Sequence, residues 1–132
     1  MPHKGHCLCG ATTITVNAEP EFNIICHCED CRRTNGSAFS SQVLAPAAST
    51  TIEGSYKTFE VQVPSGLVVT RWFCSGCGSH LMHRSAFTGD NLCVQTGNVD
   101  EFTKLPIGME LFTKDRWPSI PPIPGAQQVE TI

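Results

Sequence analysis

Cys74-Ser75-Gly76-Cys77 (residues 74–77) and Cys7-Leu8-Cys9 (residues 7–9) are the two stretches that decide the fold of this 132-residue chain. Two cysteines three positions apart on a tight turn direct both sulfur atoms to one point, and Gly76 and Gly78 permit the positive φ angles that such a turn needs. Cys7 and Cys9 are two positions apart in a predicted strand, so their side chains leave the same face. Each pair supplies two of the four sulfur ligands of a tetrahedral metal site. Together they predict a closed structural zinc site with the ligands Cys7, Cys9, Cys74 and Cys77.

A second cluster, Cys26-His27-Cys28-Glu29-Asp30-Cys31, packs three thiols into six residues. Cys26 and Cys28 share a face of an extended segment, and Cys31 follows where the chain turns into a short helix. Three protein ligands leave one coordination position for water or substrate, which is typical of a catalytic zinc site. The alternative is a second structural zinc that is completed by a histidine such as His27 or by another residue.

The remaining cysteine, Cys93, lies in an apolar run, Asn91-Leu92-Cys93-Val94, and is predicted to be a buried core thiol. The start of the chain has no apolar stretch behind a positively charged segment, and no apolar run is long enough to span a bilayer. We therefore expect a cytoplasmic protein whose thiols stay reduced, which favours metal binding over a disulfide or redox role for the cysteine clusters.

The charge balance bears on the class of partner. Nine basic residues stand against twelve acidic ones, and the formal net charge is −3. This composition argues against a broad basic surface for nucleic acid or for an anionic membrane.

Short runs with strand-like alternation and β-branched residues dominate the chain, and turn signals separate them. No stretch keeps a helical period over three turns, so the sequence predicts a small, mainly β fold with short helices. The predicted strands are 12–16, 40–44, 55–61, 67–73, 81–84, 91–96 and 109–113, and the predicted short helices are 29–35 and 99–102.

The length predicts one domain, residues 1–117, followed by a proline-rich C-terminal tail, residues 118–132. Four prolines, which can continue neither a helix nor a strand ladder, mark this tail. We expect the tail to be extended, either lying on the domain or loose in solvent.

The ordered motifs of the chain resemble those of the glutathione-dependent formaldehyde-activating family, which has an Mss4-like β fold. The resemblance runs from Gly5 to about Trp117. Its marks are Gly5-His6-Cys7-Leu8-Cys9-Gly10, Cys26-His27-Cys28-Glu29-Asp30-Cys31-Arg32-Arg33, Gly36-Ser37-Ala38-Phe39, Arg71-Trp72-Phe73-Cys74-Ser75-Gly76-Cys77-Gly78-Ser79 and Gly97-Asn98-Val99-Asp100. The resemblance implies two zinc ions per chain: a structural one held by the four-cysteine set and a more labile one, beside the active site, held by Cys26, Cys28 and Cys31.

The family's named activity is the condensation of glutathione with formaldehyde to S-hydroxymethylglutathione. The resemblance therefore implies a zinc-dependent carbon–sulfur lyase that forms or cleaves a thiol adduct of a small molecule, with glutathione as co-substrate. The catalytic residues would be Cys26, Cys28 and Cys31. Arg32 or Arg33 would hold a glutathione carboxylate, since guanidinium pairs with it bidentately. The alternative is a zinc-stabilised protein-interaction module without catalytic activity.

Overall fold

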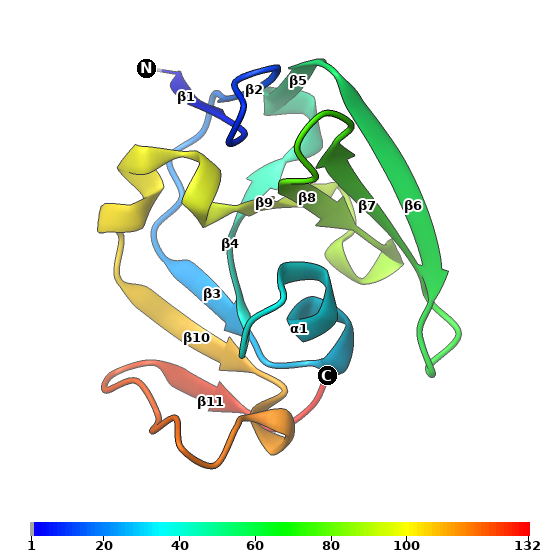
Figure 1. The fold of residues 1–132 in the computed structure, drawn as a ribbon. Coiled ribbons are helices and arrows are strands. Elements are labelled where there is room, and N and C mark those ends of the chain that lie inside the picture. Colours follow the sequence, from blue (N-terminus) through cyan, green and yellow to red (C-terminus); the bar gives the residue numbers. More distant parts are fainter. Residues whose placement is uncertain (1) are drawn as a thin grey trace.

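The computed structural model describes residues 2–132, which form two β-sheets, one short α-helix and several 3₁₀ turns (Figure 1). In this part of the chain, the smaller sheet has the strand order β1-β2-β5 and the larger one β11-β10-β3-β4-β9-β8-β7-β6. The smaller sheet consists of β1 (His3–His6), β2 (Thr12–Val16) and β5 (Thr50–Gly54). The larger sheet consists of β3 (Asn23–Cys26), β4 (Ser40–Pro46), β6 (Tyr56–Gln62), β7 (Val68–Cys74), β8 (His80–Arg84), β9 (Asn91–Gln95), β10 (Ile107–Leu111) and β11 (Gln127–Val129). The predicted mainly β fold is confirmed.

Strand β10 occupies a special place in the larger sheet. It runs parallel to β3 on one side and parallel to β11 on the other, whereas the remaining pairs of this sheet are antiparallel. In the register, Glu110 lies opposite Ile25 of β3 and Gln128 of β11. One strand thus connects the end of β3, which carries Cys26, with the C-terminal segment of the chain.

The single α-helix, α1 (Glu29–Asn35), begins directly after β3. Cys28 is its N-cap, and its sulfur accepts a hydrogen bond from the backbone N–H of Cys31 at 3.4 Å. Acidic residues occupy the first turn and basic residues the last, which complements the helix dipole. Gly36 ends the helix with φ of 62°, a left-handed conformation that side chains disfavour. The predicted helix 29–35 is therefore confirmed at both ends.

The hydrophobic core links the two sheets and includes two of the cysteines. Ile14 and Val16 point inward from β2, as their alternation with exposed threonines predicts, and both are fully buried. Phe102, from the 3₁₀ turn η4 (Asp100–Lys104), packs in the same cluster. Cys7 and Cys74 belong to this cluster as well, so the four-cysteine set is continuous with the core. The other 3₁₀ turns are η1 (Ala47–Ser49), η2 (Ala86–Thr88), η3 (Thr96–Asn98) and η5 (Thr113–Asp115).

Two expectations about local structure need correction. Cys7 and Cys9 lie in the tight turn between β1 and β2, not in a strand, because the backbone N–H of Gly10 closes the turn on the Cys7 carbonyl at 3.1 Å. The last predicted strand, 109–113, is displaced toward the N-terminus because Phe112 adopts a left-handed φ of 55° and ends β10 at Leu111. The C-terminal tail lies on the domain, and residues 127–129 of it form β11.

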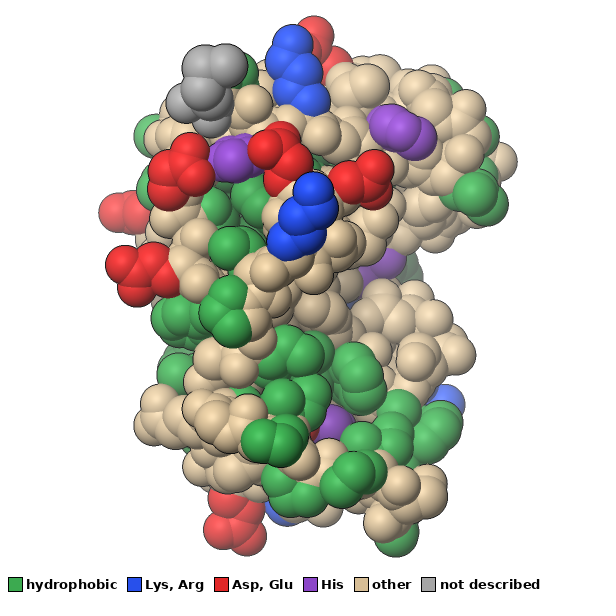
Figure 2. All heavy atoms as spheres, turned by 90° about the vertical axis from the view of Figure 1, so that its left-hand side faces the viewer, with side chains coloured by type: hydrophobic (Ala, Val, Ile, Leu, Met, Phe, Trp, Pro, Cys, Tyr) green, Lys and Arg blue, Asp and Glu red, His purple; other side chains and the backbone are tan. Residues whose placement is uncertain are grey.

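On the face shown in Figure 2, acidic side chains are interspersed with basic ones in the upper half, and hydrophobic side chains gather in the lower half. None of the helices in residues 2–132 combines the length and the apolar composition that a bilayer crossing requires.

Candidate metal centres

The first cysteine cluster joins the turn after β1 to the end of β7. The sulfur atoms of Cys7, Cys9, Cys74 and Cys77 all lie within 4.8 Å of one another. Cys7 Sγ is 3.6 Å from Cys9 Sγ, which is 3.7 Å from Cys74 Sγ. Four thiolates at the usual Zn–S distance of about 2.3 Å form a tetrahedron with edges of about 3.8 Å. The observed spacing matches that tetrahedron and is far longer than a disulfide bond of about 2.05 Å; all eight cysteines are free thiols.

Backbone N–H groups point at the sulfur atoms of this cluster. Thr12 donates to Cys7 Sγ at 3.4 Å, and Gly76 donates to Cys74 Sγ at 3.3 Å. Hydrogen bonds from Ser79 lower the pKa of Cys77 to about 5. Such donors favour the thiolate, which is the form that binds metal. The donor set therefore fits a divalent soft metal ion.

The two glycines of this turn have different roles, which corrects part of the sequence interpretation. Gly78 adopts φ of 77°, as predicted, and ends the turn. Gly76 does not adopt a positive φ. Its contribution is the backbone N–H that faces Cys74 Sγ.

The second cluster lies where β3 passes into α1. Cys26 is the last residue of β3, Cys28 caps the helix and Cys31 occupies its first turn, and the three sulfur atoms lie within 4.8 Å of one another. Cys26 and Cys31 are buried, and Cys28 is half-buried. Hydrogen bonds from Cys26 and Cys28 lower the pKa of Cys31 well below its ordinary value. In the part of the chain that the structure describes, no histidine or carboxylate atom completes this group.

His27 lies between two of these cysteines in sequence, but its ring points elsewhere. Its Nε2 is 2.7 Å from Glu110 Oε1 and both side chains are buried. The edge of the ring also packs against Phe39, with ring centroids 5.5 Å apart. The alternative in which His27 supplies the fourth ligand does not fit this geometry, because Glu110 engages Nε2 and neither ring nitrogen lies within 4.8 Å of all three sulfur atoms.

A buried arginine that sequence reasoning missed stands beside the second cluster. Arg71 is only 6% exposed, and its Nη2 lies 3.9 Å from Cys31 Sγ. Its Nε and Nη1 have no hydrogen-bond partner, and none of the ion pairs among residues 2–132 includes it. A buried cation without a carboxylate is costly unless another negative group balances it. A thiolate at Cys31, whose pKa is lowered, provides that balance.

The signal for Arg71 was present in the sequence. In the predicted strand 67–73, Arg71 lies on the same face as Leu67, Val69 and Phe73 and therefore occupies an inward position. A charged residue on an apolar strand face indicates a buried partner or a functional site.

Two histidines of β8 complete the surroundings of Cys31. The rings of His80 and His83 stack with centroids 5.8 Å apart. Burial lowers the pKa of His80 to about 3 and that of His83 to about 4; the charge of Arg71 adds to both shifts, and that of Cys31 opposes them. Both imidazoles are therefore neutral at physiological pH. Neither joins the sulfur cluster.

A cavity of about 480 Å³ opens between the end of α1, the start of β8 and η3. Its lining includes Asn35, His80 and Asn98. His80 Nδ1 is 3.1 Å from Asn35 Oδ1, and Asn98 Nδ2 donates to the His80 carbonyl at 2.7 Å. The buried Nε2 of His80 has no partner among residues 2–132.

The two arginines predicted to bind glutathione lie on α1, outside the lining of this cavity. Arg33 is exposed and pairs with Glu29 one turn earlier, with Nη2 2.9 Å from Oε1. Arg32 is half-buried. The contact of Arg32 or Arg33 with a carboxylate of glutathione stays a prediction.

Cys93 lies apart from both clusters in β9 and is 6% exposed. Burial raises the pKa of its thiol to about 12, so it is an unreactive core residue.

The comparisons with known proteins agree with this arrangement. The family model described as glutathione-dependent formaldehyde-activating enzyme matches residues 2–115. A Penicillium rubens protein with the provisional name glutathione-dependent formaldehyde-activating enzyme is 28% identical over 79 residues, which cover 60% of this chain and 41% of that relative. The chain thus matches less than half of the relative's length. A crystal structure of a Rhodobacter sphaeroides protein superposes with a TM-score of 0.61 at 20% identity, covering 79% of this chain and 98% of that one, and shows a shared fold. The match over residues 2–115 places this chain in the glutathione-dependent formaldehyde-activating family.

Proposed function

We propose that this chain is a zinc-dependent carbon–sulfur lyase that forms or cleaves a glutathione adduct, most simply S-hydroxymethylglutathione. In the forming direction, the sulfur of glutathione attacks the carbonyl carbon of formaldehyde. A carbon–sulfur bond forms, the electron pair of the C=O π bond moves to oxygen, and that oxygen takes up the proton that the thiol has lost. The reverse reaction returns thiol and aldehyde, so no oxidant or reductant is needed.

The observation that carries the proposal is the cluster of Cys26, Cys28 and Cys31, which offers three sulfur ligands and, within residues 2–132, no fourth. We assign one zinc ion to this site and a second, structural one to Cys7, Cys9, Cys74 and Cys77. When bound at the three-cysteine site, zinc supplies Lewis-acid chemistry toward a substrate sulfur. Cys28 is the most accessible of the three ligands, which favours an approach of the substrate from its side.

Arg71 and His80 are assigned roles around this site. Three thiolates and a divalent cation carry a formal charge of −1, and the guanidinium of Arg71 beside Cys31 offsets it. His80 lines the cavity, and we assign to it a hydrogen bond with a polar group of the substrate. Arg32 and Arg33 remain candidates for a carboxylate of glutathione at the outer surface of α1.

The first expected result is catalysis of the exchange between formaldehyde and its glutathione adduct. With ¹³C-labelled formaldehyde and glutathione, exchange spectroscopy measures the rates of adduct formation and cleavage. The zinc-loaded protein should raise both rates above the spontaneous values by the same factor, because a catalyst leaves the equilibrium unchanged. The Cys93→Ala variant is the matched control, since it loses a thiol outside both clusters. Rates equal to the spontaneous ones, in a protein that holds zinc, would instead support the protein-interaction module.

A second expected result concerns the buried cation. The Arg71→Met variant keeps much of the volume of the side chain but removes its charge, so the negative cluster beside it becomes less favourable. We expect about a tenfold loss in turnover and in zinc retention at the three-cysteine site, as when other partners of metal ligands are removed. The Arg84→Met variant is the control, because Arg84 lies on the neighbouring strand, and its side chain donates a hydrogen bond to the Gly89 carbonyl at 3.5 Å and forms no ion pair within residues 2–132. Equal zinc retention in the two variants would contradict the role of Arg71.

A further inference from the structure

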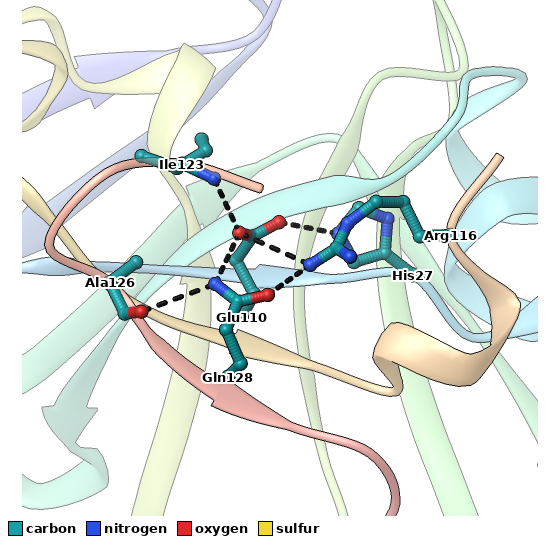
Figure 3. A network of polar contacts seen from close by, with 6 residues as sticks. All are labelled: His27, Glu110, Arg116, Ile123, Ala126 and Gln128. Atoms are coloured by element: carbon teal, nitrogen blue, oxygen red, sulfur yellow. Dashed lines mark hydrogen bonds and ion pairs between the residues drawn. The ribbon is translucent and has the colours of Figure 1, made fainter. Parts of the chain in front are cut away.

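A buried carboxylate connects the second cysteine cluster with the C-terminal end of the chain (Figure 3). Glu110 of β10 is only 1% exposed. Its Oε1 accepts a hydrogen bond from His27 Nε2 at 2.7 Å. Its Oε2 accepts from the backbone N–H of Ile123 at 2.9 Å and from Gln128 Nε2 at 2.7 Å, and Arg116 Nη2 lies 3.4 Å away. Oε1 therefore contacts the residue between Cys26 and Cys28, and Oε2 contacts the C-terminal part of the chain.

The partner of Oε1 is placed to influence metal binding. His27 is bonded through the backbone to Cys26 on one side and to Cys28 on the other. Its ring is fixed by Glu110 and by Phe39, and its backbone N–H donates to the Leu111 carbonyl at 3.0 Å. A shift of this ring would therefore move the two cysteines that flank it.

The two hydrogen-bond donors to Oε2, Ile123 and Gln128, come from the segment of residues 118–132, which lies beyond the residues that the family model matches. Ile123 is the only residue of the run Pro121-Pro122-Ile123-Pro124 that has a backbone N–H, and this N–H points at Glu110. Both polar atoms of the Gln128 side-chain amide are hydrogen-bonded, since its Nε2 also donates to the Ala126 carbonyl and its Oε1 accepts from Arg116. The segment is thus oriented toward one carboxylate.

Burial alone would raise the pKa of Glu110, but the hydrogen bonds from Gln128, Ile123 and His27 outweigh burial and lower it to about 2. The group is therefore an ionised carboxylate at physiological pH, and charge-assisted hydrogen bonds of this kind are about twice as strong as neutral ones. Loss of one donor would leave an incompletely paired buried charge, which favours rearrangement of the whole network.

We propose that residues 118–132 form a C-terminal latch that positions Cys26 and Cys28 for the second metal ion through Glu110 and His27. In this role Glu110, Gln128 and His27 are positioning residues. The inference rests on the three-cysteine zinc site proposed above. It assigns to the proline-rich segment a part in metal retention that its sequence does not suggest.

The test compares two neighbouring glutamines of β11. Gln128→Ala removes a donor to Glu110, whereas Gln127→Ala alters an exposed side chain that makes no hydrogen bond to the network. The rate at which the zinc-loaded protein releases metal to a chelating dye reports the two sites as a fast and a slow phase. We expect Gln128→Ala to accelerate the fast phase about tenfold and to leave the slow phase unchanged. Gln127→Ala should release both ions as the parent protein does.

Two further readouts separate positioning from a general loss of stability. In the cobalt-substituted protein, Gln128→Ala should shift the absorption bands of the three-cysteine site and leave those of the four-cysteine site unchanged. Because Gln128 acts through Glu110, adding Gln128→Ala to Glu110→Gln should cause little extra acceleration. Additive effects of the two substitutions, or parent-like release in both single variants, would overturn the latch.

A separate variant distinguishes failure of the latch from failure of the proposed site. Cys28→Ser removes a ligand outright. If Cys28→Ser loses the rapidly released zinc while Glu110→Gln and Gln128→Ala retain it, the site stands and the latch is wrong. If Cys28→Ser retains both ions, the three-cysteine site is wrong, and the latch that rests on it fails with it.

Discussion

Replacement of Cys74 by serine should unfold the protein. Cys74 ends β7 of the larger sheet, is 1% exposed and has its sulfur 3.7 Å from that of Cys9 in the turn between β1 and β2. A zinc ion bound at this set would therefore tie the three-stranded sheet to the eight-stranded one. Structural zinc sites contribute about 10–16 kcal/mol of apparent folding free energy, whereas a domain of this size has a net stability of about 5–15 kcal/mol. Loss of the ion would therefore cost a free energy comparable to the whole net stability of the domain.

Zinc content and circular dichroism of the purified Cys74→Ser variant measure this result. The variant should contain no zinc at the four-cysteine site and should show no cooperative unfolding transition in urea. Cys93→Ala is again the control, because it alters a buried thiol outside the clusters and should cost only about 0.5–3 kcal/mol. A folded Cys74→Ser protein with the zinc content of the parent would refute the structural role of this set.

Strand β2 was predicted correctly because its residues show a recognisable pattern, whereas β3 and β11 were missed because theirs do not. Residues 12–16 alternate between buried and exposed positions, and β2 has those bounds. By contrast, all four residues of β3 are buried because the strand lies inside the sheet, so Asn23–Cys26 shows no alternation. Strand β11 follows a run of prolines and contains only three residues, and its pairing with β10 depends on contacts across the chain.

The same distinction applies to the candidate sites. The spacing within each cysteine pair or triplet is local, and two pairs of thiols complete one tetrahedral site, so the sequence was sufficient to predict both groups that the structure brings together. Arg71 and Glu110 were missed because their partners are distant: Cys31 is 40 positions from Arg71, and His27 is 83 positions from Glu110. No local pattern marks such pairs, although a charged residue on the apolar face of a predicted strand indicates where to look.

Cys28→Ser is expected to abolish turnover while the protein stays folded. Serine is a poor zinc ligand but a good N-cap. In the parent, Cys28 caps α1 through a hydrogen bond from the Cys31 N–H at 3.4 Å, and the serine hydroxyl can accept the same bond. The substitution therefore removes the ligand and keeps the start of the helix. The four-cysteine set and the core are untouched, so the unfolding transition should remain cooperative.

The measurable outcome is a change from close to two zinc ions per chain to close to one, with formaldehyde exchange reduced to the spontaneous rate. Cys28→Ala separates the two roles of the residue, since it loses both ligand and cap and should be less stable than Cys28→Ser by about 0.5–2 kcal/mol. If Cys28→Ser kept both ions and the parent's exchange rate, the reaction would have to take place elsewhere. If it lost one ion and kept the rate, the three-cysteine site would be structural, because a ligand whose loss leaves turnover intact cannot hold the reacting sulfur.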